Sequence, residues 1–236
     1  MLTNIIALMT EWGPNFMRGL VSTLQIALGA YALGIALGTL GAIGKLRGGP
    51  VLRIVLETYT TLFRALPELV LILLLYYAGT GALNALLVSL GFERVFLPGV
   101  LAGILVIGIV QGAYSTEVIR GAMLAVPKGQ MEAATAFGMG PFLRFRRILL
   151  PAMLPLALPG LANLWLIVTK DTALLAVVGV EELALVTRQA AGSTRLWLEA
   201  FLVAGMFYLA ITLVSNQLFR ALERRVTRGL PQPGTA

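Results

Sequence analysis

The 236-residue chain contains no cysteine and no histidine. Without cysteine there can be no disulfide or thiolate metal site, and without histidine the commonest zinc ligand and general base are missing. Charged residues make up only 12% of the chain, whereas a soluble domain carries about 25%. We therefore expect neither an ordinary hydrolase nor a metalloenzyme, and the sequence predicts no metal site and no catalytic residue.

Two functional segments are also missing. No G-x-x-x-x-G-K-[ST] loop occurs, because Gly44-Lys45 is followed by Leu46, so the chain is not expected to bind ATP. The opening stretch MLTNIIALMTEWGP has an acidic residue and no basic one, so we expect a retained first span and not a cleaved signal peptide. The net charge of +7 is not gathered on a polar domain, so a nucleic-acid partner is not expected.

Apolar residues dominate what is present. They make up 58% of the chain, and the mean hydropathy is +0.88. A helix needs about 20 mostly apolar residues to cross a bilayer, and five stretches qualify. The sequence therefore predicts an all-α integral membrane protein that forms one domain over residues 1–236. The expected spans are 19–43, 55–79, 97–118, 154–179 and 197–220.

The distribution of Lys and Arg predicts an orientation. Segments 44–54 and 119–153, with the chain from residue 220, hold twelve of these residues, whereas the N-terminus, 80–96 and 180–196 hold four. Cytoplasmic loops of membrane proteins carry an excess of Lys and Arg. We therefore expect the N-terminus outside and the C-terminus in the cytoplasm, which an odd number of spans permits.

Glycines four residues apart recur in two of the expected spans. The first span contains Gly34 and Gly38, and the third contains Gly99 with Gly103 and Gly108 with Gly112. Small residues at this spacing let helix backbones approach closely in a membrane. We expect this packing within the chain, with an interface to another subunit as the alternative.

Residues 128–151, KGQMEAATAFGMGPFLRFRRILLP, are a polar and basic stretch between apolar runs. Pro127 can begin a helix at its first turn, residues 128–137 contain good helix formers, and the glycines at 138 and 140 with Pro141 end that helix. A second short helix is expected over 142–149. Two short helices joined by a glycine bend suit a rigid knob that docks into a groove of another protein.

The spacing within this stretch is specific. Glu132-Ala133-Ala134 is followed after three residues by Gly138, and after nine more by Ile148, which leads to Pro151. The arrangement resembles the EAA loop of the membrane subunits of bacterial ATP-binding-cassette (ABC) importers. The resemblance implies that these six residues contact a separate ATPase and couple its work to transport.

The resemblance covers roughly residues 20–225. Residues 114–121, YSTEVIRG, look like the Y-x-x-E-x-x-R-G stretch of polar amino acid permeases. Residues 59–67, YTTLFRALP, are similar to the family's Y-x-x-x-F-R-G-T-P, with Ala65-Leu66 replacing Gly-Thr. Residues 170–174, KDTAL, resemble its K-x-T-S-L, with Ala173 replacing the serine. TTLFRALPELVL and AVPKGQMEAATAFG carry the similarity to the branch that imports histidine, lysine, arginine, ornithine and opines.

The resemblance implies a type I importer fold and a multi-pass protein of the bacterial inner membrane. It also implies a second permease subunit, which we expect to be a different sister subunit, with two ATPase subunits and a periplasmic amino-acid-binding protein. No cofactor is expected in this chain, because ATP and Mg would be bound by the partner ATPase. Membrane lipid is the remaining expected partner.

Ionisable residues inside a membrane span are costly and are candidates for function. Arg64 and Glu68 are four residues apart, so one helical face could hold them as an ion pair. Alternatively, Glu68 could face a water-filled cavity and attract a cationic substrate, since many relatives have an apolar residue there. Tyr76 and Tyr77 could wall such a cavity.

Two further pairs of charged residues favour a structural role. Lys170 and Asp171 are expected to form an ion pair within the protein. Glu117, near Arg120 and Arg47, is expected to tie the third span to the cytoplasmic surface.

The leading hypothesis is an importer subunit that moves a polar, basic amino acid from periplasm to cytoplasm. Within this class, a neutral or acidic cargo such as glutamine or glutamate is the alternative. A membrane channel or scaffold that needs no ATP is the alternative from another class, but a channel predicts rings of polar residues and no docking knob.

Overall fold

The computed structural model describes residues 1–95 and 97–227, and all regular elements in these ranges are helical. Arg228, which was part of the charge count, lies outside the described residues. Five helices are long and apolar enough to cross a membrane, as the sequence predicted. The α-helices are α1 (Leu2–Arg47), α2 (Pro50–Ala65), α3 (Glu68–Leu74), α4 (Thr80–Ser89), α5 (Gly99–Ala125), α6 (Lys128–Ala136), α7 (Pro141–Arg144), α8 (Leu150–Asp171), α9 (Leu183–Thr194) and α10 (Trp197–Val226). Short π-helical and 3₁₀ segments cover Leu75–Gly79, Phe145–Leu149 and Thr172–Val178.

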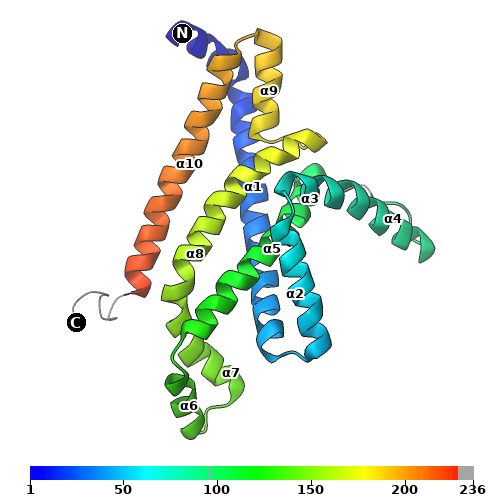
Figure 1. Cartoon of the computed structure of the whole chain (residues 1–236). Coiled ribbons are helices and arrows are strands. Elements are labelled where there is room, and N and C mark those ends of the chain that lie inside the picture. Colours follow the sequence, from blue (N-terminus) through cyan, green and yellow to red (C-terminus); the bar gives the residue numbers. More distant parts are fainter. Residues whose placement is uncertain (96, 228–236) are drawn as a thin grey trace.

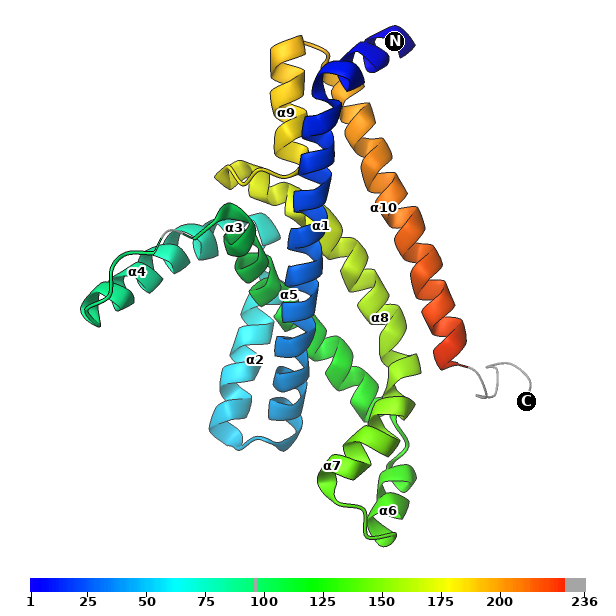
Figure 2. The same ribbon diagram turned by 180° about the vertical axis from the view of Figure 1, so that it is seen from behind.

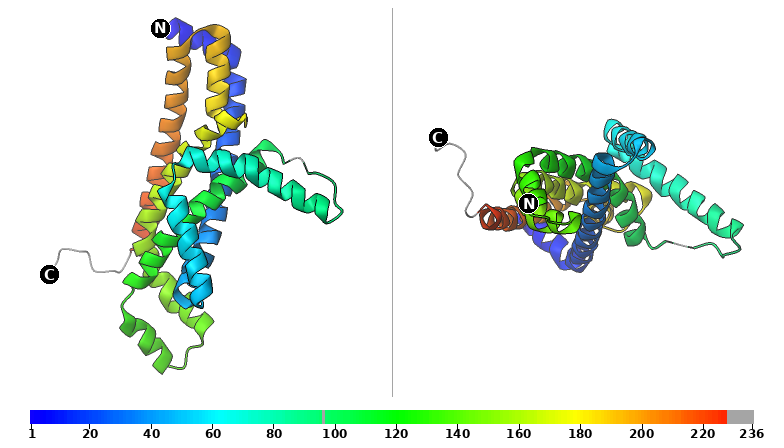
Figure 3. Two further views of the ribbon diagram at one scale, coloured as in Figure 1. Left: turned by 45° about the vertical axis from the view of Figure 1, so that its right-hand side comes forward. Right: turned by 90° about the horizontal axis from the view of Figure 1, so that it is seen from below.

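The long helix α1 runs along the length of the molecule, and α5 and α8 cross it (Figure 1). At the N-terminal end of α1, α9 and the start of α10 pack beside it, while α6 and α7 project together at the opposite end (Figure 2). Helix α4 extends sideways from the bundle, which both views of Figure 3 show. Two clusters of buried apolar residues lie mainly along α1, α5 and α8, and a third joins the N-terminal part of α1 to α9 and α10.

Glycines of α1 and α5 allow these two helices to pack closely. A Cβ at Gly34 would lie 2.7 Å from Cγ of Gln111, and one at Gly108 would lie 2.7 Å from Cδ2 of Leu33. A Cβ at Gly38 would meet the backbone carbonyl carbon of Ser115 at 2.8 Å. The close packing within the chain that the glycine spacing predicts is therefore confirmed, and a small side chain at these points is a steric requirement.

The boundaries of the spans differ from the prediction, and the first two spans illustrate the reasons. The first helix begins at Leu2, not at residue 19, and it continues through Pro14 although proline removes one backbone hydrogen-bond donor. The expected span 55–79 is divided at Leu66 and Pro67, and the apolar helical stretch that follows covers Glu68–Ser89. The reason is local, since a proline disfavours helical geometry in the residue before it.

Glu182 fixes the start of α9 against the neighbouring helices. Its carboxylate accepts hydrogen bonds from the backbone N–H groups of Ala184 at 2.9 Å and Leu185 at 2.8 Å, which makes it the N-cap of α9. Hydroxyl groups of Thr23 and Tyr208 also donate to it, so it joins α1, α9 and α10. The side chain is fully buried, and burial raises the pKa of the Glu182 carboxyl against the effect of these four donors.

Candidate functional site

The break between α2 and α3 places the candidate substrate residues. Helix α2 ends at Ala65, and Leu66 is extended with a ψ of 147°. Pro67 follows, and Glu68 is the first residue of α3. Arg64 and Glu68 therefore lie on two helices and not on one face of a single helix. Of the two interpretations that the sequence left open for Glu68, the ion pair with Arg64 is not formed, since no salt bridge joins them in the described part of the chain.

Glu68 instead faces two groups from other helices. The carboxyl group of Asp171, the last residue of α8, lies beside that of Glu68. The hydroxyl group of Tyr114, from the middle of α5, lies next to the same Glu68 carboxyl group. All three side chains are half-buried. Residues far apart in the sequence thus form an acidic cluster, which we define as Glu68, Asp171 and Tyr114.

The expected ion pair between Lys170 and Asp171 is also wrong, since the described residues contain no salt bridge between them. Successive residues of an α-helix point about 100° apart. Lys170 is exposed, whereas Asp171 turns towards Glu68. Among the described residues no Lys or Arg forms a salt bridge with these two carboxylates, although Arg64 and Lys170 are near enough to act electrostatically on the cluster.

The two tyrosines line two different pockets, and Glu68 is in the lining of neither. Tyr76 lines a polar pocket of about 370 Å³ with Ser22 and Glu181. Tyr77 is exposed and lines a different pocket, of about 420 Å³, with Asn84 and Arg94. Their rings lie edge to face with centroids 5.4 Å apart. Both belong to the π-helical segment, which rotates neighbouring side chains relative to a regular α-helix.

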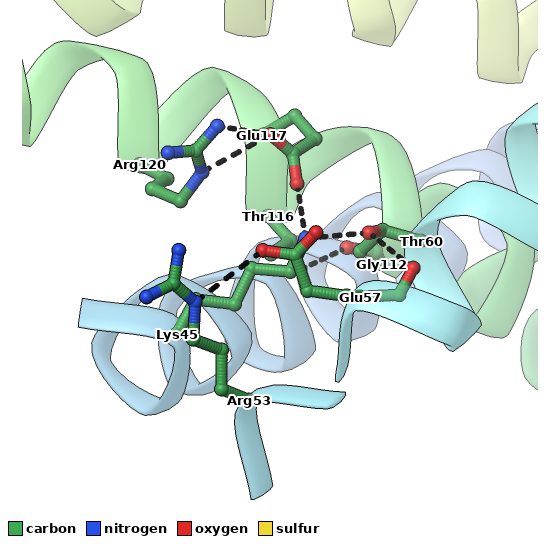
Figure 4. Close-up of polar contacts among 8 residues, drawn as sticks. All are labelled: Lys45, Arg53, Glu57, Thr60, Gly112, Thr116, Glu117 and Arg120. Atoms are coloured by element: carbon green, nitrogen blue, oxygen red, sulfur yellow. Dashed lines mark hydrogen bonds and ion pairs between the residues drawn. The ribbon is translucent and has the colours of Figure 1, made fainter. Parts of the chain in front are cut away.

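A buried network of charges joins three helices on the side of the break nearest α6 and α7 (Figure 4). The Lys45 ammonium group, from the last turn of α1, donates hydrogen bonds of 2.6 Å to both Thr60 of α2 and Glu117 of α5. Arg120 donates to the other oxygen of Glu117 at 2.8 and 3.1 Å. The predicted structural pair of Glu117 and Arg120 is present in the structure.

Sequence reasoning assigned Lys45 to a loop and named Arg47 as the residue near Glu117. The structure continues α1 through both residues and buries Lys45, whose side chain is 4% exposed, while Arg47 is exposed. The glycine pattern of α1 is the sequence feature that could have predicted the contact between Lys45 and Glu117. Gly41 lies four residues before Lys45 on the side that packs against α5, so that face continues towards Glu117.

The predicted hairpin is present as two short helices. Helix α6 spans Lys128–Ala136, and α7 with the π-helical turn that follows it covers 141–149. Gly138 has a φ of +71°, a left-handed conformation that suits glycine, and it forms the bend between the helices. Arg144 of α7 donates a hydrogen bond of 2.5 Å to the hydroxyl of Thr135 in α6, which holds the two helices together.

The six candidate coupling residues have different environments. Glu132, Ala133, Gly138 and Pro151 are exposed, Ile148 is half-buried and Ala134 is buried. Two phenylalanines that sequence reasoning did not select lie on either side of the bend, with Phe137 84% and Phe142 74% exposed. An exposed surface of small residues, flanked by two aromatic rings, is chemically suited to contact with another protein.

The chemistry of these sites is electrostatic and mechanical. Within residues 1–95 and 97–227, no group of three or more Asp and Glu residues is arranged to hold a metal ion. The acidic cluster can attract a cation, because two neighbouring carboxylates repel each other unless a proton or a positive charge lies between them.

Comparison with known proteins identifies the family. Residues 30–228 match the family described as "Binding-protein-dependent transport system inner membrane component". The histidine/lysine/arginine/ornithine transport system permease protein HisQ of Salmonella typhimurium is 43% identical over 217 residues, covering 91% of this chain and 94% of that protein. The octopine transport system permease protein OccQ of Rhizobium radiobacter is 41% identical over 224 residues, covering 93% of each chain.

Solved structures agree with this assignment. A chain of an amino acid ABC transporter crystallised with histidines superposes with a TM-score of 0.76 at 28% identity, covering 92% of this chain and 96% of that one. A chain of the MetNI methionine ABC transporter, at 19% identity, shares the fold with a TM-score of 0.71, covering 90% and 96%. The protein is therefore a member of the binding-protein-dependent transport system inner membrane components, the permease subunits of ABC importers.

Proposed function

We propose that this chain is the membrane-spanning subunit of an ATP-driven importer that carries a basic amino acid, or an opine derived from one, into the cytoplasm. One observation carries the choice of cargo: the carboxyl groups of Glu68 and Asp171 converge from α3 and α8. The two relatives described above are named for histidine, lysine, arginine and ornithine and for octopine, which supports the same class of cargo.

The acidic cluster explains why the cargo would be cationic. A guanidinium or ammonium group placed between Glu68 and Asp171 relieves the repulsion between the two carboxylates. In a partly dehydrated site, such a charge-assisted contact contributes on the order of 1–3 kcal/mol. The Tyr114 hydroxyl supplies an additional polar contact beside the carboxylates. A neutral cargo such as glutamine would gain nothing comparable, and an acidic cargo such as glutamate would be repelled.

The hairpin is the proposed point of coupling. Residues 128–151 would dock on a dimer of cytoplasmic ATPases that hold ATP and Mg, with Gly138 and the alanines of α6 allowing close contact. The rigid arrangement of α6 and α7 supports this proposal, because a force applied to the hairpin passes directly into α8. Residues 1–236 would form one permease domain beside a sister permease subunit, with a periplasmic binding protein delivering the cargo.

The cargo proposal is tested by uptake of arginine and glutamine into vesicles containing the whole transporter. Glu68→Gln and Asp171→Asn preserve side-chain volume and remove one charge each. Either variant should raise the arginine concentration for half-maximal uptake by about tenfold, which corresponds to about 1.4 kcal/mol. Glu57→Gln is the matched control, since Glu57 is exposed and pairs only with Arg53, at 3.7 Å.

Uptake of arginine at the wild-type level by both variants would show that the acidic cluster does not bind the cargo. Family membership would be unaffected by that result. Loss of uptake together with loss of the assembled complex would instead assign the two carboxylates a structural role.

A further inference from the structure

An apolar groove of about 570 Å³ lies between α1, α8 and α10. Helix α10 runs along the outer side of the bundle, with α8 between it and α5 (Figure 1). The groove is lined mainly by leucines and aromatic rings, including Leu24 and Tyr31 of α1, Trp165 of α8, and Ile211 and Leu222 of α10. All three helices contribute to candidate membrane spans, so the groove is within reach of the bilayer.

The polar atoms in the groove wall are already paired within the protein. The Tyr31 hydroxyl donates a hydrogen bond of 2.9 Å to the carbonyl of Leu161. Trp165 donates from its indole nitrogen to the Ser215 hydroxyl at 2.8 Å. The two rings pack edge to face, with centroids 5.3 Å apart, and so form a fixed floor. An occupant therefore has no need of hydrogen-bonding groups, and a hydrocarbon chain meets the requirements of this surface.

The length of the groove fits a lipid chain. On α10 its lining extends from Phe207 to Leu222, which is about 22 Å of helix at 1.5 Å per residue. Half of the hydrocarbon core of a bilayer is about 15 Å thick. The groove is therefore long enough for an acyl chain that enters from the C-terminal end of α10 to lie in it across the whole hydrocarbon layer of one leaflet.

A positive charge stands at that end of the groove. The lining residues of α10 include Leu218 and Leu222. Arg225 comes seven residues after Leu218 and three after Leu222, so it lies on the same face of the helix. Arg225 is exposed, in the last turn of the helix. Glu223 and Arg224 project away from this face, because each residue turns the helix by about 100°. The charge next to the groove opening is therefore positive.

We propose that this groove binds one acyl chain of an anionic phospholipid, whose headgroup contacts Arg225. The combination of an apolar, internally paired wall and the Arg225 cation near its opening matches the two parts of such a lipid. A second protein subunit would match the apolar wall but would leave Arg225 without a specific partner, so a lipid is the occupant that the charge favours.

The test uses the whole transporter reconstituted in phosphatidylcholine vesicles that contain a trace of photoreactive lipid. The reactive group sits on the acyl chain of either phosphatidylglycerol or phosphatidylcholine, and labelled peptides are located by mass spectrometry. Labelling of the peptides that contain Trp165 and residues 207–222 should be about fivefold higher with phosphatidylglycerol. Arg225→Gln should abolish this preference.

Two variants serve as controls. Arg220→Gln removes a charge from the same helix on a different face and should keep the preference for phosphatidylglycerol. Ala210→Trp should fill the groove and remove labelling by both lipids, while ATP hydrolysis shows that the complex is intact. Equal labelling by the two lipids in the unmodified protein would overturn the proposal. It would also be overturned if a photocrosslinking amino acid placed at Val214 gave a covalent product with the sister permease, because the groove would then be a subunit interface.

Discussion

The Arg144 guanidinium donates a hydrogen bond from Nη1 to the Thr135 hydroxyl at 2.5 Å, across the bend at Gly138. This contact connects the second helix of the hairpin to the first. The Thr135 hydroxyl in turn donates to the Met131 carbonyl at 2.8 Å, which ties the contact to the body of α6. The hairpin can therefore move as one unit when another protein pushes on it.

We expect loss of this contact to uncouple ATP hydrolysis from transport. Arg144→Gln and Thr135→Val each remove the hydrogen bond, so the hairpin should flex under load and transport less cargo for each ATP hydrolysed. The measurement is the ratio of uptake to phosphate release in reconstituted vesicles. Arg146→Gln is the control, since Arg146 is an exposed cation two residues away. An unchanged ratio in both variants would show that the contact does not stiffen the hairpin.

The Lys45–Glu117 pair should contribute strongly to stability. Lys45→Met leaves the Glu117 carboxylate half-buried with Arg120 as its remaining partner, and removing one member of a buried pair costs about 3 kcal/mol. Thermal unfolding of the purified complex measures this loss. The double variant Lys45→Met/Glu117→Gln should recover part of it, because the half-buried side chain of residue 117 is then uncharged, and the Arg120 side chain that loses its partner is 35% exposed to solvent.

The exposed pair of Arg53 and Glu57 provides the matched comparison. Its atoms lie 3.7 Å apart and both side chains are more than half exposed, so Arg53→Gln should change stability by less than about 1 kcal/mol. Equal destabilisation by Arg53→Gln and Lys45→Met would contradict the role assigned to the buried pair.

Gly38→Ala should separate α1 from α5. The added Cβ would overlap the side chain and the backbone of Ser115, and backbone atoms in two packed helices cannot move aside independently. Overpacking of this kind costs about 1–3 kcal/mol. Gly205→Ala in α10 is the control, because nothing lies within 4 Å of its new Cβ. That variant should be neutral, or more stable by about 0.5–1 kcal/mol because alanine favours a helix.

Labelling of single cysteines tests the proposed orientation directly, because the chain contains no cysteine of its own. A membrane-impermeant thiol reagent applied to the periplasmic side should label Thr3→Cys and should leave Thr227→Cys unlabelled. The reason is the excess of Lys and Arg in the segments on the C-terminal side of the membrane. Labelling of Thr227→Cys in intact spheroplasts would contradict the predicted orientation.

Sequence patterns predicted the features that depend on near neighbours. Five apolar stretches of sufficient length gave five candidate spans, and the spacing of glycines gave the close packing of α1 against α5. The glycine bend of the hairpin followed from Gly138, since a left-handed residue there suits glycine. These features are local because they depend on helix periodicity, on side-chain size and on the backbone preferences of glycine and proline.

The partners of the charged residues were decided only by the tertiary structure. The sequence allowed Glu68 to pair with Arg64 or to face a cavity, and it predicted that Asp171 pairs with Lys170, since both pairs are close in the chain. The break at Pro67 separates the first pair, and helix rotation separates the second, so Glu68 and Asp171 meet across 103 residues of sequence. Lys45 likewise pairs with Glu117, which is far from it in the sequence. A charged residue inside a membrane protein pairs with a group that helix packing places beside it, and the distance between two residues in the sequence does not determine that packing.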